Sequence, residues 1–327
     1  MQMQGAMELV RSNRKRNELL ASYRMPEAES TLKLVARSIL WTPYLIWKLR
    51  QMEHTKATRF WFPNRNNEAI EGVMYSLDDK EQKPIVVYDC GYKRGRSNFP
   101  MIGKAIACLG YRAVSIFSRE ELKAMEADDY TDALAYLRTY SQYKRLFGPK
   151  TAFVVISGGG NVLYRCCSSQ EFVDKNQVVC GVSIATYSRL DKQFEYMKEK
   201  LKDPNIDKNA RRVLLDYNDH ATRIGLTPDA NPEMFRLGSP VTYAPELKVR
   251  VLVLHGESDP IVEAHNAIEI KQAAGIMAKL RMVVGEGFHG NPEKWKLGPN
   301  FSLKEAVGVL ATVGYAYHFL KKMFRQA

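Results

Sequence analysis

The feature that most constrains this chain is an apolar run that ends in a serine followed by three glycines. In Thr151–Leu163, TAFVVISGGGNVL, five apolar residues lead into Ser157, and a helical pattern follows the glycines. A short apolar run of this kind is typical of a strand buried on both faces, and glycine permits a tight turn. The stretch therefore predicts a buried strand, a sharp turn and a helix, with the side chain of Ser157 presented outward at the turn.

Strands and helices alternate over most of the chain around this stretch. Apolar runs predict further strands at 84–91, 112–118, 177–188, 249–256 and 280–287, after an antiparallel hairpin at 58–77. Helical spacing predicts helices at 102–111, 128–141, 264–277 and 303–324. Because the strands are continuous in Val and Ile rather than alternating in polarity, they indicate an α/β fold with a mostly parallel sheet and helices on both faces.

Two segments interrupt this alternation and divide the chain. Residues 189–248 are charged and contain several prolines, and they predict a helical cap inserted over the carboxyl edge of the sheet, where ligands bind in such folds. Residues 1–56 predict a helical, basic extension. The α/β core then comprises residues 57–188 and 249–327.

Two later strand ends carry an acid and a histidine. VLVLHGESDPIV places Asp259 just past one buried strand, and LRMVVGEGFHG places His289 just past the next. A serine hydroxyl becomes a nucleophile when a histidine takes its proton and a carboxylate orients that histidine. We therefore expect Ser157, Asp259 and His289 to act together. Other acids that could serve, none of which ends a strand just before the histidine strand, are Asp128, Asp129 and Asp191.

These motifs together resemble the α/β-hydrolase family, whose serine, acid and histidine follow one another in this order. HGESDPIV is similar to the acid loop of the family and GEGFHG to its histidine loop, and the resemblance covers roughly residues 58–324. It implies the α/β-hydrolase fold with a helical cap. It also implies a serine hydrolase that cleaves a carboxylic ester or thioester with a hydrophobic acyl group, by way of an acyl-enzyme.

The resemblance also implies where an oxyanion would be held. The backbone N–H groups of Gly158, after the serine, and of Tyr92, after the strand at 84–91, would point at the developing negative charge. Gly91 would let the backbone approach, and Gly159 and Gly160 would support the turn. Cys90 is an alternative nucleophile, but it lacks a strand–turn–helix of its own.

The turn departs from the family pattern G-x-S-x-G at its first position. Val155 stands where the family has glycine. In a second register Gly159 would occupy the nucleophile position, and the chain would be a non-catalytic protein that binds a ligand or partner. Acyl transfer is a third alternative, because its motifs are the same as those of hydrolysis.

Composition bears on partners and compartment. The net charge of +12 favours an anionic membrane surface or a role in solubility, and nucleic acid is not expected because no helix-turn-helix, RNP or zinc pattern accompanies it. Five cysteines without a CxxC pair, and a start without a continuous apolar run, predict a cytoplasmic protein. No residues have metal-ligand spacing, so neither a metal nor another cofactor is expected.

The segment at 31–49 combines apolar, aromatic and basic residues. Its clean apolar run is too short to span a bilayer. One interpretation is an interfacial anchor with Trp41, Tyr44 and Trp47 at the level of the lipid headgroups, which would make the protein peripherally membrane-associated. The other is a helix that packs on the body of the protein or on another subunit, as in a homo-oligomer.

Overall fold

The computed structural model describes most of the chain. The described residues are 43–44, 47–48, 50–78, 81–91, 100–117, 126–223, 225–290, 294 and 298–327. Trp41 and Tyr92, both singled out in the sequence, lie outside them.

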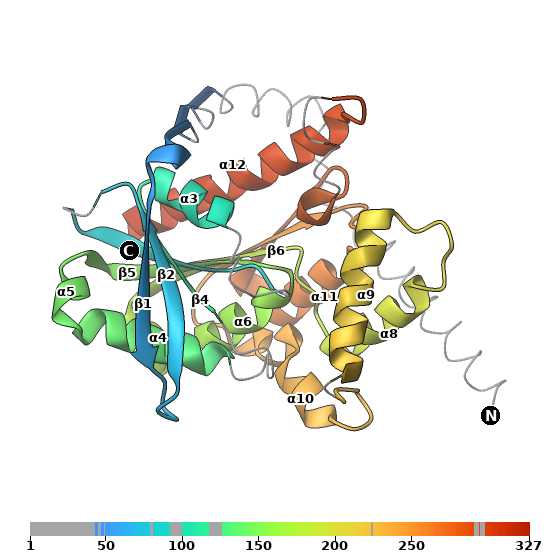
Figure 1. Ribbon diagram of the computed structural model, residues 1–327, viewed down its shortest axis with the longest axis horizontal. Coiled ribbons are helices and arrows are strands. Elements are labelled where there is room, and N and C mark those ends of the chain that lie inside the picture. Colours follow the sequence, from blue (N-terminus) through green and yellow to red (C-terminus); the bar gives the residue numbers. More distant parts are fainter. Residues whose placement is uncertain are drawn as a thin grey trace.

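An eight-stranded sheet forms the centre of the described structure (Figure 1). Its strands are β1 (Lys56–Pro63), β2 (Ala69–Ser76), β3 (Lys83–Asp89), β4 (Arg112–Ile116), β5 (Phe147–Ile156), β6 (Val178–Ile184), β7 (Val251–Gly256) and β8 (Ala278–Val283). They lie in the order β1-β2-β4-β3-β5-β6-β7-β8. β2 is antiparallel to both β1 and β4, and every other neighbouring pair is parallel. The predicted mostly parallel sheet with an antiparallel hairpin at one edge is thus confirmed.

Helices precede, connect and follow these strands. The α-helices are α3 (Pro100–Cys108), α4 (Glu126–Thr139), α5 (Ser141–Lys144), α6 (Gly160–Ser168), α7 (Gln170–Asn176), α8 (Leu190–Lys200), α9 (Lys208–Arg223), α10 (Pro232–Leu237), α11 (His265–Ala274) and α12 (Leu303–Gln326). Short 3₁₀ turns are η1 (Arg50–His54), η3 (Ser157–Gly159), η4 (Pro240–Thr242), η5 (Ala244–Glu246), η6 (Gly275–Met277) and η7 (Gly287–His289).

The sheet is buried on both faces, which explains why its strands read as continuous apolar runs. In β3, Ile85 and Val87 belong to the core that α4, α6, α7 and α11 cover, whereas Val86 and Tyr88 belong to the core beneath α3 and α12. All four side chains are fully buried. Successive residues of a strand point to opposite faces, so a strand between two helical layers needs apolar residues at every position.

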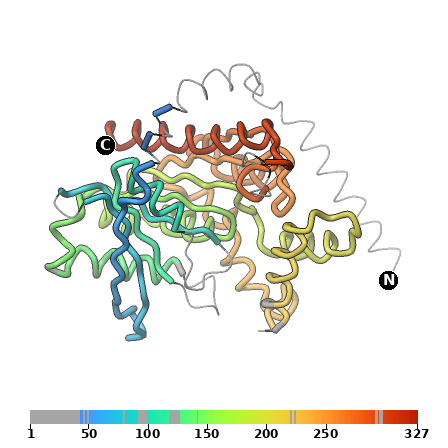
Figure 2. The backbone as a smooth tube through the Cα atoms, turned by 45° about the horizontal axis from the view of Figure 1, so that its top comes forward, coloured from blue at the N-terminus to red at the C-terminus, as the bar shows by residue number. Residues whose placement is uncertain are grey.

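Helices α8, α9 and α10 lie between β6 and β7 in the sequence, and they stand to one side of the sheet, away from the hairpin of β1 and β2 (Figure 2). Their apolar residues form a separate cluster that includes Phe194, Leu214 and Phe235. Ile261 and Val262, from the loop after β7, belong to the same cluster. The helices of segment 189–248 therefore pack directly on the loop that carries Asp259.

Candidate active site

Ser157 occupies a strained corner between β5 and α6. β5 ends at Ile156, the 3₁₀ turn η3 begins at Ser157, and α6 begins at Gly160. Ser157 has φ = +55°, a left-handed conformation that costs a residue with a Cβ about 1–3 kcal/mol and that persists only where its surroundings impose it. Gly159, by contrast, already has the helical φ of −64°. The residue at the corner is the serine, and the glycine lies in the helical turn after it.

The glycines after Ser157 lie against the ends of the neighbouring strands. A Cβ added at Gly159 would come within 2.6 Å of the carbonyl oxygen of Asp89, and one at Gly160 within 2.0 Å of Cγ2 of Thr186. The turn therefore needs small residues after the serine. Val155, where the family pattern has glycine, is fully buried in the core cluster that α6 joins.

The loop after β3 reaches the same corner. Gly91 has φ = +75°, and a Cβ at this position would lie 2.7 Å from the backbone nitrogen of Gly158 and 3.1 Å from Cβ of Ser157. Its own N–H donates to Oδ1 of Asp89 at 2.9 Å. Only glycine leaves room for this approach, so the backbone that leads to Tyr92 passes directly beside the amide of Gly158.

Asp259 and His289 are brought together from the ends of β7 and β8. Nδ1 of His289 lies 2.8 Å from Oδ2 and 3.0 Å from Oδ1 of Asp259. Oδ1 also accepts the backbone N–H groups of Ile261 and Val262, each at 2.9 Å. The carboxylate side chain is fully buried, while the imidazole is 11% exposed. Because Nδ1–H donates to Asp259, the other ring nitrogen, Nε2, is left as the one that can take a proton.

The acid and histidine loops interlock through their backbones. Ser258 N–H donates to the carbonyl oxygen of Gly285 at 3.1 Å. A Cβ at Gly256 would lie 2.6 Å from the carbonyl carbon of Glu286. Gly285 and Gly287 both have positive φ, +79° and +64°. The two loops therefore hold a single relative position, which fixes the distance from His289 to its carboxylate.

Glu305, at the start of α12, binds the backbone of the histidine loop. Its Oε2 accepts the backbone N–H of Glu286 at 2.6 Å, and the residue is only 8% exposed. Sequence reasoning missed this residue. The one pattern that marks Glu305 in the sequence is S-x-x-E from Ser302, which is typical of a helix start. Oγ of Ser302 does accept the N–H of Glu305 at 3.4 Å. The carboxylate of Glu305, however, accepts from the histidine loop rather than from the start of the helix.

His255 lies beneath the acid loop. Its Nε2 donates to the carbonyl oxygen of Val262 at 2.8 Å, so the ring supports the same turn whose N–H groups bind Asp259. The side chain is fully buried, and this burial lowers the pKa of His255, which keeps the ring neutral. His255 therefore acts as a fixed hydrogen-bond donor.

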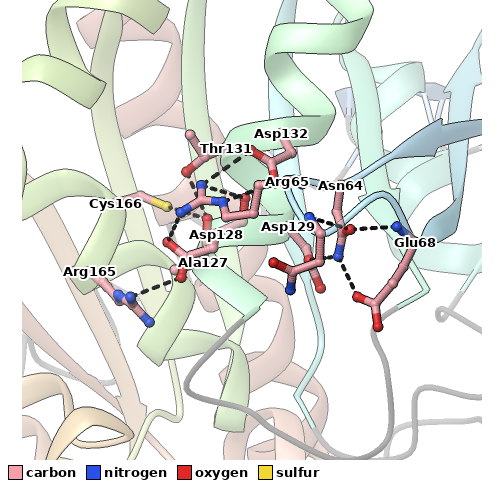
Figure 3. Close-up of polar contacts among 11 residues, drawn as sticks. Asn64, Arg65, Glu68, Ala127, Asp128, Asp129, Thr131, Asp132, Arg165 and Cys166 are labelled. Carbon is pink, nitrogen blue, oxygen red and sulfur yellow. Dashed lines mark hydrogen bonds and ion pairs between the residues drawn. The ribbon is translucent and has the colours of Figure 1, made fainter.

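The alternative acids pair with side chains other than histidine: Asp128 with Arg65 and Arg165, Asp129 with Asn64, and Asp191 with Arg189. Figure 3 shows the first two pairings, where α4 meets α6 and the turn between β1 and β2. The Asp128–Arg165 contact of 3.0 Å ties α4 to α6. Among the acids predicted from sequence, Asp259 is the one that hydrogen-bonds to His289.

The cysteines offer little as nucleophiles. Cys108, Cys166, Cys167 and Cys180 are buried, and Cys90 is half-buried beside Gly91. Burial raises the pKa of the Cys166 and Cys180 thiols, which disfavours the reactive thiolate. Within the described ranges, no three His, Cys, Asp or Glu side chains converge as metal ligands would.

A cavity of about 420 Å³ is lined by the C-terminal part of α8, the loop after it and the acid loop, Asp259 included. Its lining includes Asp203, Asp207, Glu257 and Glu263. Ser157 and His289 are not among the described residues that line it. The cavity is therefore separate from the corner at Ser157, although it touches the same acid loop.

Comparison with known proteins bears on the fold. No protein-family model matches the sequence, and no curated protein matches it significantly. Among solved structures, an esterase of Pyrococcus furiosus is similar with a TM-score of 0.58 at 15% identity, covering 84% of this chain and 93% of its own. An acylaminoacyl peptidase of Pyrococcus horikoshii (TM-score 0.58, 14% identity) and a puromycin hydrolase (0.59, 16%) each align with 83% of this chain.

The chain spans only 41% and 39% of the lengths of that peptidase and that puromycin hydrolase. Identities at this level bear on the fold alone. The mostly parallel eight-stranded sheet, with helices on both faces and an antiparallel β2, agrees with these similarities in fold. The protein therefore has the α/β-hydrolase fold that the sequence predicted.

Proposed function

We propose that the protein is a serine hydrolase in which Ser157, His289 and Asp259 form the catalytic triad. The observation that carries the proposal is the short Asp259–His289 hydrogen bond, together with the strained corner at Ser157. A serine held at positive φ between a strand and a helix is the arrangement that exposes its hydroxyl in such folds. Strain of this kind at a polar residue is characteristic of functional sites.

In the proposed reaction Oγ of Ser157 attacks the substrate carbonyl carbon while Nε2 of His289 takes the hydroxyl proton. Asp259 holds the imidazole by its Nδ1–H and stabilises the imidazolium that forms. The backbone N–H groups of Gly158 and Tyr92 would bind the oxyanion. His289 then gives its proton to the leaving group, which departs and leaves an acyl-enzyme. Water, deprotonated by His289, attacks the acyl carbon and releases the acid and Ser157.

Two observations support Ser157 over Gly159 as the nucleophile position. Ser157 has the positive φ, whereas Gly159 is already helical. Gly91 also packs against the amide of Gly158, the residue that would follow the nucleophile, and this close approach sets the loop after β3 beside that N–H. In the other register no side chain would stand at the corner, and a lack of reaction with a serine-directed probe would favour the non-catalytic alternative.

We propose a carboxylic ester or thioester with a hydrophobic acyl group as the substrate class. The Pyrococcus furiosus esterase, which matches over 93% of its own length, supports ester chemistry more directly than the longer peptidases do. An acyltransferase would form the same acyl-enzyme and differ only in its acceptor. Release of free acid into water, measured without and with an added alcohol or thiol, distinguishes the two.

Labelling with a fluorophosphonate probe tests the proposal. The wild-type protein should form a covalent adduct and hydrolyse p-nitrophenyl esters, whereas Ser157→Ala and His289→Ala should lose both properties. Ser258→Ala is the matched control, since Ser258 is an exposed serine beside Asp259 and should leave labelling intact. Full labelling of Ser157→Ala, or a wild-type protein inert to every probe and ester, would contradict the proposed function.

A further inference from the structure

One end of α12 carries a surface built from three separate segments. The hydroxyl groups of Tyr44 and Tyr317 lie 3.1 Å apart, and their ring centroids are 5.9 Å apart. Trp47 packs 6.2 Å from Tyr44. Figures 1 and 2 both place the blue segment around 43–54 beside the C-terminal half of α12 and next to α3. We call this the aromatic–basic surface: Tyr44, Trp47, Lys48, Lys104, Tyr317, Lys321, Lys322 and Arg325.

Two of the three aromatic residues of this surface are open to solvent, and the third, Tyr317, is only 4% exposed. Trp47 is 55% exposed and Tyr44 38% exposed, although both rings pack on neighbours. Single exposed apolar residues are common on protein surfaces. Here, however, an exposed indole and a partly exposed phenol stand side by side, which suits the boundary between headgroups and acyl chains.

Cations surround these rings. The ammonium of Lys48 lies 5.1 Å from the ring centroid of Trp47, and that of Lys321 lies 5.5 Å from that of Tyr317. Lys104 on α3, and Lys322 and Arg325 on the last turns of α12, extend the positive charge.

Acidic residues are scarce in the segments that build this surface. Neither α3 nor the part of α12 after Tyr317 contains one, and the 43–54 segment has Glu53 alone. The edge strand β8 adds Lys279 and Arg281. Burial lowers the pKa of Lys279, and the nearby positive charges of Arg281 and Lys322 lower it further. Basic residues therefore outnumber acidic residues in these segments.

We propose that the aromatic–basic surface docks the protein on an anionic lipid bilayer, with Trp47 and Tyr44 at headgroup level and the cations against lipid phosphates and carboxylates. Charge complementarity favours an anionic partner, and the exposed Trp47 favours a partner that also accepts apolar side chains. The phosphate backbone of a nucleic acid would bind the basic side chains but would leave the exposed indole of Trp47 without an apolar partner. The docking is peripheral: none of the described helices is long and apolar enough to cross a membrane. It does not depend on the proposed hydrolysis.

Co-sedimentation of the full chain with vesicles tests this inference. Vesicles of phosphatidylcholine mixed with phosphatidylserine should bind the protein, vesicles of phosphatidylcholine alone should not, and added salt should weaken the binding. Each basic residue near an anionic membrane is worth about fivefold in affinity, so neutralising three should cost roughly a hundredfold. The variant is Lys321→Gln/Lys322→Gln/Arg325→Gln. Trp47→Ala should also weaken binding without changing its salt dependence.

A second triple variant controls for net charge. Lys192→Gln/Lys202→Gln/Lys208→Gln removes the same number of charges from exposed positions on and between α8 and α9. It should bind the vesicles like the wild type. Circular dichroism checks that both triple variants and Trp47→Ala are folded.

Several outcomes would overturn the inference. A wild-type protein that ignores both kinds of vesicle, or binds both equally, has no anionic-membrane surface. Equal loss in the two triple variants would show that only net charge matters. Unchanged binding of Trp47→Ala would remove the aromatic part of the argument. Tighter binding to a DNA duplex than to the phosphatidylserine vesicles, lost in the first triple variant, would assign the surface to nucleic acid.

Discussion

Replacement of Glu305 tests whether α12 positions the proposed catalytic histidine. The carboxylate of Glu305 accepts the N–H of Glu286, three residues before His289, at 2.6 Å. It also lies where a Cβ at Gly285 would stand, at 2.4 Å from Oε2, so the loop and the carboxylate fit closely. Glu305→Ala removes the acceptor and opens space behind the loop, whereas Glu305→Gln keeps an oxygen acceptor and removes only the charge.

The magnitude follows from the bond that is lost. A hydrogen bond to a charged group contributes about 1.5–3 kcal/mol, and a buried N–H left without an acceptor costs about 1–3 kcal/mol. We expect Glu305→Ala to lower the free energy of unfolding by about 2 kcal/mol and Glu305→Gln by about 1 kcal/mol. A misplacement of about 1 Å in a catalytic group can cost about a hundredfold in rate. We therefore expect kcat to fall roughly ten- to a hundredfold in Glu305→Ala, with KM little changed, and to recover largely in Glu305→Gln.

Urea unfolding and p-nitrophenyl ester kinetics, at a temperature where every variant is folded, measure the two effects. Lys304→Ala is the matched control, because Lys304 is the exposed neighbour on the same turn of α12. If Glu305→Ala loses stability but keeps the wild-type kcat, the carboxylate supports only the fold. In that case the reasoning about His289 is refuted.

Two further predictions concern stability. Gly159→Ala would place a Cβ 2.6 Å from the backbone oxygen of Asp89 and should lower the free energy of unfolding by about 1–3 kcal/mol. Gly314→Ala, whose Cβ would have nothing within 4 Å, should raise the free energy of unfolding by about 0.5–1 kcal/mol. Urea unfolding midpoints measure both changes, and equal changes in the two variants would contradict the packing argument. The lowered pKa of buried His255 means that the unfolded chain binds more protons, so stability should fall as the pH drops below about 6.5. His255→Asn should flatten that dependence, and a slope unchanged between pH 5 and 7 would count against it.

The strands were predictable because their environment is uniform. The run at 84–91 became β3 (Lys83–Asp89), since every residue between two helical layers must be apolar. The run at 177–188 extended too far: β6 ends at Ile184, and Ala185, which is buried and apolar like a strand residue, has φ = +51°. Hydrophobicity reports burial, and it cannot distinguish a buried strand residue from a buried turn residue.

The site was predictable in part for a different reason. Asp259 and His289 lie in the loops after β7 and β8. Parallel strands bring their carboxyl ends to one edge, so the meeting of these two residues follows from topology. The contact between Glu305 and Glu286 joins a helix to a loop across 19 positions, and no local pattern encodes it. The same holds for the glycine at 256, whose need for a small side chain arises from a backbone on another strand end.

The interlocked acid and histidine loops have a consequence for synthesis. The proposed nucleophile, Ser157, leaves the ribosome more than a hundred residues before His289, and Glu305 follows later still. Because β7, β8 and α12 together position the imidazole of His289, a growing chain can form its serine corner long before the proposed base has been synthesised. An unfinished or prematurely terminated chain would thus carry an unreactive serine. A fluorophosphonate adduct would therefore report not only activity. It would also show that β7, β8 and α12 have been synthesised and have packed against the rest of the protein.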